Sequence, residues 1–346
     1  MIDKEKVKNG IINMLKVNMG LKDGEKLLIV TDFPAEKDWL ERDSAALTDF
    51  VTRSILARMV YEIAKEEFPN CTIDFHVYPA TGRHGAEPPE ETAKKLKEYD
   101  VVIAITTFSI THTKARKEAT DAGVRIASMP MFLPEMFYPE GPMGADYTKI
   151  SEETEKIAKL LTEAKEAVIK SPGGTDIKLS LEGREAHADT GLLTKKGAVG
   201  NLPAGEAYIA PLEGTAEGKV VVEAGWFPGL EENMTLVFKN GEVTEVIGGG
   251  KVGDKFRDLL RPGVDEEPYK SRRNLAELGI GTNPNAKRPD NVLEAEKIKG
   301  TVHIAIGDNS TFGGKVSTDL HQDFIIPKPT LYLDGKLVMK DGEFVV

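Results

Sequence analysis

Cysteine is almost absent from this sequence: Cys71 is the only one in 346 residues. A single thiol cannot form an intrachain disulfide, and it cannot build a metal site from several thiolates. The sequence also has no run of about 18 apolar residues, the length that a membrane-spanning helix needs. Residues 1–6 have no apolar signal character, so we expect a cytoplasmic protein with no membrane partner. Any metal site must therefore use nitrogen and oxygen ligands.

Signature motifs of several large enzyme classes are missing as well. The first half contains no Gly-x-Gly-x-x-Gly, and neither Gly-x-Ser-x-Gly nor His-Glu-x-x-His occurs anywhere in the chain. The segment 313–318 resembles a phosphate-binding loop, but Val316 stands where Ser or Thr should follow the lysine. These absences give no support to a nucleotide-binding protein, a serine hydrolase with a nucleophile elbow, or a zinc protease of the His-Glu-x-x-His type.

Positive charge is in deficit. The 45 Lys and Arg residues face 56 Asp and Glu residues, which gives a net charge of −11. Such a balance argues against nucleic acid as a partner and against binding to an anionic membrane surface. The hydrophobic fraction of 40% is typical of a globular protein. We therefore expect a cytoplasmic enzyme.

The first half of the chain alternates between strand and helix patterns. Residues 101–106 form a continuous apolar run, which is typical of a strand buried on both faces. Residues 46–66 have apolar side chains at helical spacing, and residues 114–121 read as a further helix. This alternation predicts a doubly wound α/β domain with a mostly parallel sheet.

The second half changes character. Short alternating segments are separated by Gly, Pro and Asn, and residues 235–246 read as a hairpin with an Asn-Gly turn. We expect a mainly antiparallel, β-rich domain here. Residues 129–147 read as a loop and residues 150–170 as a helix that links the domains. The predicted domains are therefore 1–165 and 166–346.

Two histidines and an aspartate lie close together near the end of the chain: His303, His321 and Asp323. If residues 319–326 form a strand, His321 and Asp323 point to the same face, because side chains alternate along a strand. Imidazole and carboxylate groups on one face are suitable ligands for a divalent transition metal. A structural hydrogen-bonded pair is the alternative.

Carboxylates precede this pattern at suitable places. Glu206 follows a Pro-Ala-Gly turn at the entrance of a predicted strand. Glu277 shares one strand face with Gly279 and Gly281, which leaves room for a ligand or metal beside it. Glu294 and Glu296 lie just before His303, and either could supply a further carboxylate. Each of them could instead be an ordinary surface acid.

Four segments together resemble the aminopeptidase T/S family of metallopeptidases, in order and in approximate spacing. They are residues 201–206, 276–281, 300–307 and 321–323. The resemblance implies an N-terminal α/β domain, a β-rich C-terminal domain that carries two divalent metals, and a homodimer. It also implies that the metal ligands are Glu206, Glu277, Glu296, His303, His321 and Asp323.

The chain departs from that family at two positions. The family has a Glu five residues before the histidine, where this chain has Ile298, and a tyrosine seven residues after it, where this chain has Ser310. A second branch, the 2,5-dihydroxypyridine ring-cleaving dioxygenases, is also similar, particularly in the loop 307–314. That branch binds one iron, and its ligand set includes a serine where this chain has Ala305.

Our leading hypothesis from the sequence is an aminopeptidase-type hydrolase with two Zn, Co or Mn ions. It would remove N-terminal residues from peptides with a metal-activated water, and Glu206 or Glu277 would transfer the proton. The alternatives are a mononuclear iron oxygenase, using His303, His321 and Asp323, and a catalytically inert relative. His112 and Arg116 follow a buried strand and are candidates for substrate contact.

Overall fold

The computed structural model describes residues 2–345 and divides the chain into two compact units. The first unit contains the residues up to Tyr147 together with Gly191–Ala204. The second contains Thr148–Thr190 and the chain from Gly205 onward. The sequence pattern predicted a single domain boundary at residue 165. In the structure, the chain leaves the first unit after Tyr147 and returns to it once, for Gly191–Ala204.

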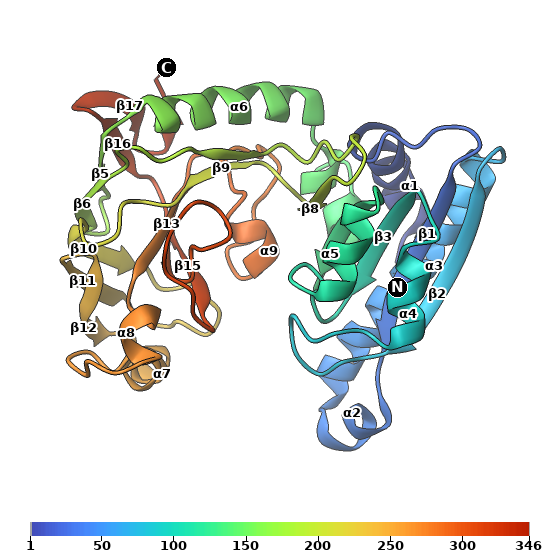
Figure 1. Cartoon of the computed structure of the whole chain (residues 1–346), viewed down its shortest axis with the longest axis horizontal. Coiled ribbons are helices and arrows are strands. Elements are labelled where there is room, and N and C mark those ends of the chain that lie inside the picture. The colour runs from blue at the N-terminus through green and yellow to red at the C-terminus, as the bar shows by residue number, and fades with distance from the viewer. Residues whose placement is uncertain (1, 346) are drawn as a thin grey trace. The chain divides into compact units, whose positions relative to one another are not determined.

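The first unit is built around a parallel five-stranded sheet with the strand order β2-β1-β3-β4-β8 (Figure 1). Its strands are β1 (Lys26–Phe33), β2 (Thr72–Pro79), β3 (Val101–Thr106), β4 (Arg125–Pro130) and β8 (Val199–Asn201). Its helices are α1 (Lys4–Asn13), η1 (Met14–Asn18), α2 (Glu36–Glu41), α3 (Ser44–Glu67), α4 (Glu90–Leu96), α5 (Lys114–Asp121), η2 (Pro134–Phe137) and η3 (Pro142–Gly144).

The residue pattern of the first unit explains its layers. All residues of β3 are buried, as the apolar run predicts. Leu28 and Val102 pack in one core cluster with Leu96 of α4 and Ala119 of α5. The predicted α/β domain with a parallel sheet is therefore confirmed.

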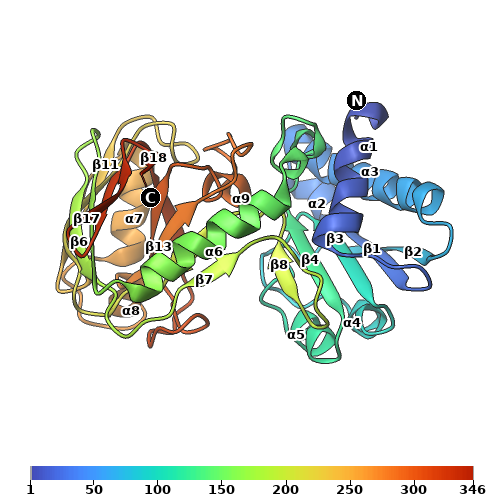
Figure 2. The same ribbon diagram turned by 90° about the horizontal axis from the view of Figure 1, so that it is seen from above.

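The second unit contains two antiparallel sheets (Figure 1 and Figure 2). The larger has the order β12-β11-β10-β6-β5-β16-β17-β18, and the smaller has the order β15-β14-β13-β9-β7. The strands are β5 (Glu166–Lys170), β6 (Asp176–Ser180), β7 (His187–Asp189), β9 (Glu206–Ile209), β10 (Glu217–Val222), β11 (Met234–Lys239), β12 (Glu242–Gly248), β13 (Leu275–Gly281), β14 (Val302–Gly307), β15 (His321–Ile326), β16 (Thr330–Leu333), β17 (Lys336–Lys340) and β18 (Glu343–Phe344). The helices are α6 (Tyr147–Glu163), α7 (Gly250–Leu260), α8 (Tyr269–Arg272) and α9 (Val292–Ala295).

One hydrophobic cluster joins the two sheets of the second unit. It contains Ile177 and Leu236 from the larger sheet and Leu278 and Ile304 from the smaller one. Because side chains alternate along a strand, residues 277 and 303 then point to the opposite face of the smaller sheet. The mainly antiparallel β-rich domain is confirmed, and this opposite face is where the polar residues gather.

The helix predicted over residues 150–170 is too long at its C-terminal end. Helix α6 ends at Glu163, and Glu166–Lys170 is strand β5. The reason is a change of period: Ala167 and Ile169 are buried in alternation, and β5 pairs with β6 and β16. The loop predicted over 129–147 also contains the short helices η2 and η3.

Among residues 2–345, no helix combines the length and the apolar composition needed to cross a bilayer.

Candidate metal centre

The six predicted metal ligands lie in the second unit, five of them on the smaller sheet and Glu296 directly after α9. Across this sheet, three of them are paired with glycines on the neighbouring strand. The pairs are Glu206 with Gly281, His303 with Gly279, and His321 with Gly307. The absence of a side chain opposite each ligand lets these long polar groups fold over the sheet toward one another.

The glycine face of β13 is occupied by protein atoms. A Cβ atom at Gly279 would collide with Nε2 of His303, and one at Gly281 would collide with the carbonyl of Ile298. The sequence suggested that these glycines leave room for a ligand or metal beside Glu277. Instead they make room for the His303 imidazole and for the turn after α9.

Glu277, His321 and Asp323 form the first cluster, which we call the histidine group. One ligand atom from each lies within 4.8 Å of the others. Nε2 of His321 is 3.4 Å from Glu277 Oε2 and 3.6 Å from Asp323 Oδ1. Its Nδ1 lies 2.8 Å from the carbonyl of Asp308, which accepts a hydrogen bond from it and so leaves Nε2 directed at the two acids.

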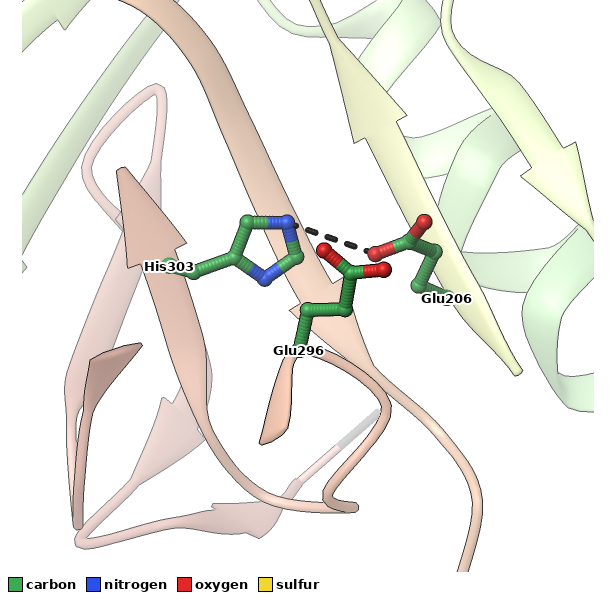
Figure 3. Close-up of side chains that lie close together, drawn as sticks. All are labelled: Glu206, Glu296 and His303. Atoms are coloured by element: carbon green, nitrogen blue, oxygen red, sulfur yellow. Dashed lines mark ion pairs between the residues drawn. The ribbon is translucent and has the colours of Figure 1, made fainter. Parts of the chain in front are cut away.

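Glu206, Glu296 and His303 form the second cluster, and with Lys297 we call it the lysine group. Ligand atoms of the two acids and His303 again lie within 4.8 Å of one another, and Figure 3 shows the three side chains converging. His303 Nε2 is 3.3 Å from Glu206 Oε2 and 3.2 Å from Glu277 Oε1. His303 therefore links the two groups through Glu277.

A buried cation stands inside the lysine group. Lys297, with a side chain only 2% exposed, places Nζ 2.5 Å from Glu206 Oε1 and 2.8 Å from Glu296 Oε1. The same nitrogen lies 3.4 Å from Asp189 Oδ2. Burial lowers the pKa of Lys297, but the surrounding acids outweigh this and raise it well above the ordinary value. The ammonium is therefore a permanent charge of the site.

The acids of the two groups differ in acidity. Burial raises the pKa of Glu206 to about 8 despite the nearby Lys297, and burial also raises the pKa of Glu296. Burial also acts to raise the pKa values of Glu277 and Asp323, but the imidazoles prevail and lower both. For Asp323, the nearby charge of His321 brings the pKa to about 2. The histidine group thus holds its acids ionised.

Unsatisfied polar atoms support a cation at this place. Among residues 2–345, no hydrogen-bond partner is present for three buried atoms of the site, namely Glu206 Oε2, His303 Nδ1 and Asp323 Oδ1. A buried polar atom without a partner is costly, and buried carboxylates are normally paired with a cation or coordinate one. The donors are carboxylate oxygens and imidazole nitrogens, which suit a divalent transition metal. The residues therefore fit a metal cofactor.

An aromatic wall adjoins the histidine group. The Phe312 ring contacts the His321 ring at 5.8 Å between centroids and the Tyr208 ring at 5.6 Å, edge to face in both cases. The His187 ring stacks on the Tyr208 ring at 5.3 Å between centroids. These rings form an apolar surface next to the candidate metal ligands.

The structure shows the surroundings of the three residues at which the chain departs from the aminopeptidase and dioxygenase patterns. Ala305 lies in register with Glu277 on one side and Asp323 on the other, so its methyl group stands between two candidate ligands. Ser310 donates hydrogen bonds from its N–H and hydroxyl to Asp308. The third, Ile298, supplies the carbonyl that crowds Gly281.

Lys297 and Asp189 belong to the site, although no sequence pattern identified them. The segment 294–299 alternates Glu and Lys around small and apolar residues, which is typical of a solvated surface. The only local sign that Lys297 could be buried is its position between the predicted ligand Glu296 and the apolar residue Ile298. Tyr208 and Phe312 were missed as well, because the aromatic wall forms only through contact between segments that are distant in the sequence.

His112 and Arg116 lie in the first unit, whereas the residues of both groups belong to the second unit. Thr113 caps helix α5 by accepting a hydrogen bond from the Arg116 N–H. The Arg116 guanidinium donates to the Thr111 carbonyl and to the Thr120 hydroxyl. These bonds explain Arg116 as a local stabiliser, and a substrate role for His112 and Arg116 stays a prediction.

Comparison with known proteins gives a consistent family. A sequence model of NicX, 2,5-dihydroxypyridine 5,6-dioxygenase, matches residues 13–346. The 2,5-dihydroxypyridine 5,6-dioxygenase of Pseudomonas putida KT2440 is 26% identical over 267 residues, which is 73% of each chain. A solved structure of 2,5-dihydroxypyridine dioxygenase from that organism superposes with a TM-score of 0.74 at 18% identity, covering 100% of this chain and 99% of the other.

A second solved structure is wild-type AmpT from Thermus thermophilus. It superposes with a TM-score of 0.64 at 18% identity and covers 99% of this chain and 100% of its own. At this identity the likeness is one of fold. The aminopeptidase-like fold expected from the motifs is therefore confirmed, together with the similarity to the dioxygenase branch.

The predicted hydrolase activity is wrong. The family match and the curated relative are dioxygenases, so the assignment as an aminopeptidase or protease is withdrawn. With it go the proton-transfer role of Glu206 or Glu277 in peptide hydrolysis and the peptide substrate. The error arose because the chain has a fold that both branches share, and fold alone does not determine the reaction.

Proposed function

This chain belongs to the 2,5-dihydroxypyridine 5,6-dioxygenase family, and on that premise we propose that it is a metal-dependent dioxygenase that opens a hydroxylated pyridine ring. The observation that carries this proposal is the extent of the family match. Residues 13–346 include both the histidine group and the lysine group, as well as the aromatic wall.

We assign one ferrous ion to the histidine group, held by Glu277, His321 and Asp323. A bound redox-active metal supplies the one-electron chemistry that O2 needs in order to react with a closed-shell ring. The set expected from sequence was His303, His321 and Asp323, but the two imidazoles belong to different groups of the structure. Glu277 is the ligand that completes the set, since it lies within 3.4 Å of His321 Nε2.

The aromatic wall has the chemistry to bind a ring. An edge-to-face or stacked contact with Phe312 or Tyr208 contributes on the order of 1 kcal/mol beyond the area buried. Phe312 touches His321, so a ring that packs against this wall lies next to the metal ligands.

Other expectations from the sequence stay predictions. The resemblance to the aminopeptidases implies a homodimer, and the composition favours a cytoplasmic location. The catalytically inert relative is the alternative that the following experiment addresses.

The test is oxygen uptake by iron-loaded protein with 2,5-dihydroxypyridine as the probe. The protein is loaded anaerobically with ferrous iron, and O2 consumption is followed together with the loss of the aromatic absorbance. We expect one O2 consumed per ring opened, because a dioxygenase places both oxygen atoms in the product. Pyridine, which lacks both hydroxyls, serves as the control substrate.

Iron-loaded protein that consumes no O2 and leaves the ring absorbance unchanged would contradict the proposal. O2 uptake without ring loss would also contradict it, because it would indicate uncoupled oxidation of the metal.

A further inference from the structure

Lys297 is an unusual residue to find in a metal site. Lysine side chains are almost never fully buried unless paired, and this one is surrounded by three acids: Glu206, Glu296 and Asp189. Its backbone is fixed as well, since its N–H donates to the Glu294 carbonyl and its own carbonyl accepts from the Asn283 N–H. The ammonium is therefore held in place from both the main chain and the side chain.

The ammonium takes one oxygen from each of the two acids of the lysine group. Oε1 of Glu206 and Oε1 of Glu296 both lie within 2.8 Å of Nζ. A divalent ion bound by these carboxylates and His303 would stand next to a positive charge at a separation where repulsion is strong. Lys297 and a metal ion are therefore alternatives for the same acids.

The histidine group contains no such internal cation. Within the described part of the chain, its acids are paired only with imidazoles, which can lose their protons when a metal binds. Lys297 Nζ lies within 3.4 Å of the two acids of the lysine group and of Asp189. The two clusters thus have similar carboxylate and imidazole ligands but different counter-ions.

We propose that the Lys297 ammonium fills the second cation position of a site that its acids could otherwise make binuclear, so that the chain binds one divalent metal, in the histidine group. The inference rests on the metal site proposed above but not on the substrate or on the reaction with O2. It assigns Lys297 a role in setting the number of metals.

The experiment counts manganese ions per chain. Metal-free protein is equilibrated with Mn²⁺, unbound metal is removed, and the ratio is measured by elemental analysis and by electron paramagnetic resonance. We expect one Mn²⁺ per chain in the wild type. Lys297→Met removes the charge and keeps the length of the side chain, and the count should rise to two. Two ions in such a site lie about 3.5–4 Å apart and give a spin-coupled spectrum.

Two matched variants serve as controls. Lys297→Arg keeps the charge and should keep the count at one. Lys299→Met removes a neighbouring lysine that is 38% exposed and paired with Glu153 at 2.7 Å. This change should also leave one Mn²⁺ per chain, since Lys299 pairs outside both groups.

A second route does not depend on how Lys297→Met folds. Glu296→Gln should leave the count at one, because Glu296 is assigned to the ammonium and not to the metal. A wild type that binds two ions or none, a folded Lys297→Met protein that still binds one, or a count of zero in Glu296→Gln would each overturn the inference. One bound Mn²⁺ with no ring opening by the iron-loaded protein would instead overturn only the proposed reaction.

Discussion

The histidine group lies on the smaller sheet, and the lysine group combines Glu206 and His303 of that sheet with two residues that follow α9. The two groups use the same kinds of ligand, yet they differ in how their negative charge is balanced. In the lysine group, Lys297 is a cation that cannot leave. In the histidine group, the acids Glu277 and Asp323 are balanced by imidazoles whose protons a metal can displace. The comparison teaches that ligand type alone does not locate a metal, because the nearest fixed charge decides which ligands are available.

His303 stands between the two groups and makes them one site. Its Nε2 is almost equidistant from Glu206 and Glu277. Burial acts to lower the pKa of His303, but the Glu277 hydrogen bond and the surrounding acids raise it to about 9 in the metal-free protein.

The largest effect should come from removing a ligand of the histidine group. His321→Ala deletes the imidazole that faces both acids, and we expect iron binding to weaken by at least ~100-fold, since even changes in the outer shell of a metal site cost 10–100-fold. Ring opening should fall to the level of the metal-free protein. Iron content after dialysis and the rate of O2 uptake measure both.

The control for this variant is His76→Ala, a histidine of the first unit that pairs with Thr92. It should keep the wild-type iron content. A His321→Ala protein that retains one tightly bound iron would show that the histidine group is not the metal site.

The next effect concerns the glycine that accommodates His303. Gly279→Ala places a methyl group into the imidazole, and overpacking of this kind costs about 1–3 kcal/mol of stability. Displacing the ring also removes the link between the two groups, so iron affinity should fall with stability. Thermal or urea unfolding and an iron titration provide the two readings.

Gly173→Ala is the matched control, because the atoms that its methyl group meets are at the flexible end of Glu223. Its stability and iron affinity should stay close to those of the wild type. Equal losses in both variants would remove the special role assigned to Gly279.

A smaller effect should separate ring binding from metal binding. Phe312→Leu keeps an apolar side chain but loses the ring contacts to Tyr208 and His321. An aromatic contact contributes about 0.5–1.5 kcal/mol, so KM for the dihydroxypyridine should rise about 2- to 12-fold. Iron content should not change. Steady-state kinetics of Phe312→Leu test this. The control is Phe344→Leu, because the Phe344 ring packs with Lys299 and not with the aromatic wall. An unchanged KM in Phe312→Leu would exclude the aromatic wall as the ring site.

The smallest effect is expected at Ala305. Ala305→Ser introduces a hydroxyl between Glu277 and Asp323, where the dioxygenase pattern has a serine ligand. Because a neutral hydrogen bond or weak ligand contributes about 1 kcal/mol, metal affinity should rise by up to ~5-fold, measured by competitive Mn²⁺ titration. A weaker affinity would indicate that the hydroxyl is not directed at the metal.

Much of this arrangement can be predicted from local sequence. The alternation in residues 275–281 and 302–307 identifies β13 and β14 and separates core residues such as Leu278 from polar ones such as Glu277. The same period places His321 and Asp323 on one face. Four motifs in a fixed order are enough to identify the superfamily, because each motif belongs to one strand or turn.

The parts that escape prediction depend on contacts between distant segments. Nothing near Lys297 in the chain reveals that Asp189 and Glu206 will surround it, and an exposed lysine is the ordinary expectation. The branch of the superfamily also escapes, because hydrolase and dioxygenase share the same scaffold. The C-terminal end of the helix predicted for residues 150–170 was placed wrongly for a related reason. Pairing with β6 and β16, and not local propensity, makes Glu166–Lys170 a strand.

The most direct test of the account locates iron in a crystal of the iron-loaded wild type, with anomalous diffraction measured on both sides of the iron absorption edge. The account predicts one iron peak per chain, about 2 Å from ligand atoms of Glu277, His321 and Asp323, with Lys297 still paired to Glu206 and Glu296. Two peaks per chain, or a peak bound by Glu206 and Glu296 with the Lys297 ammonium displaced, would contradict it.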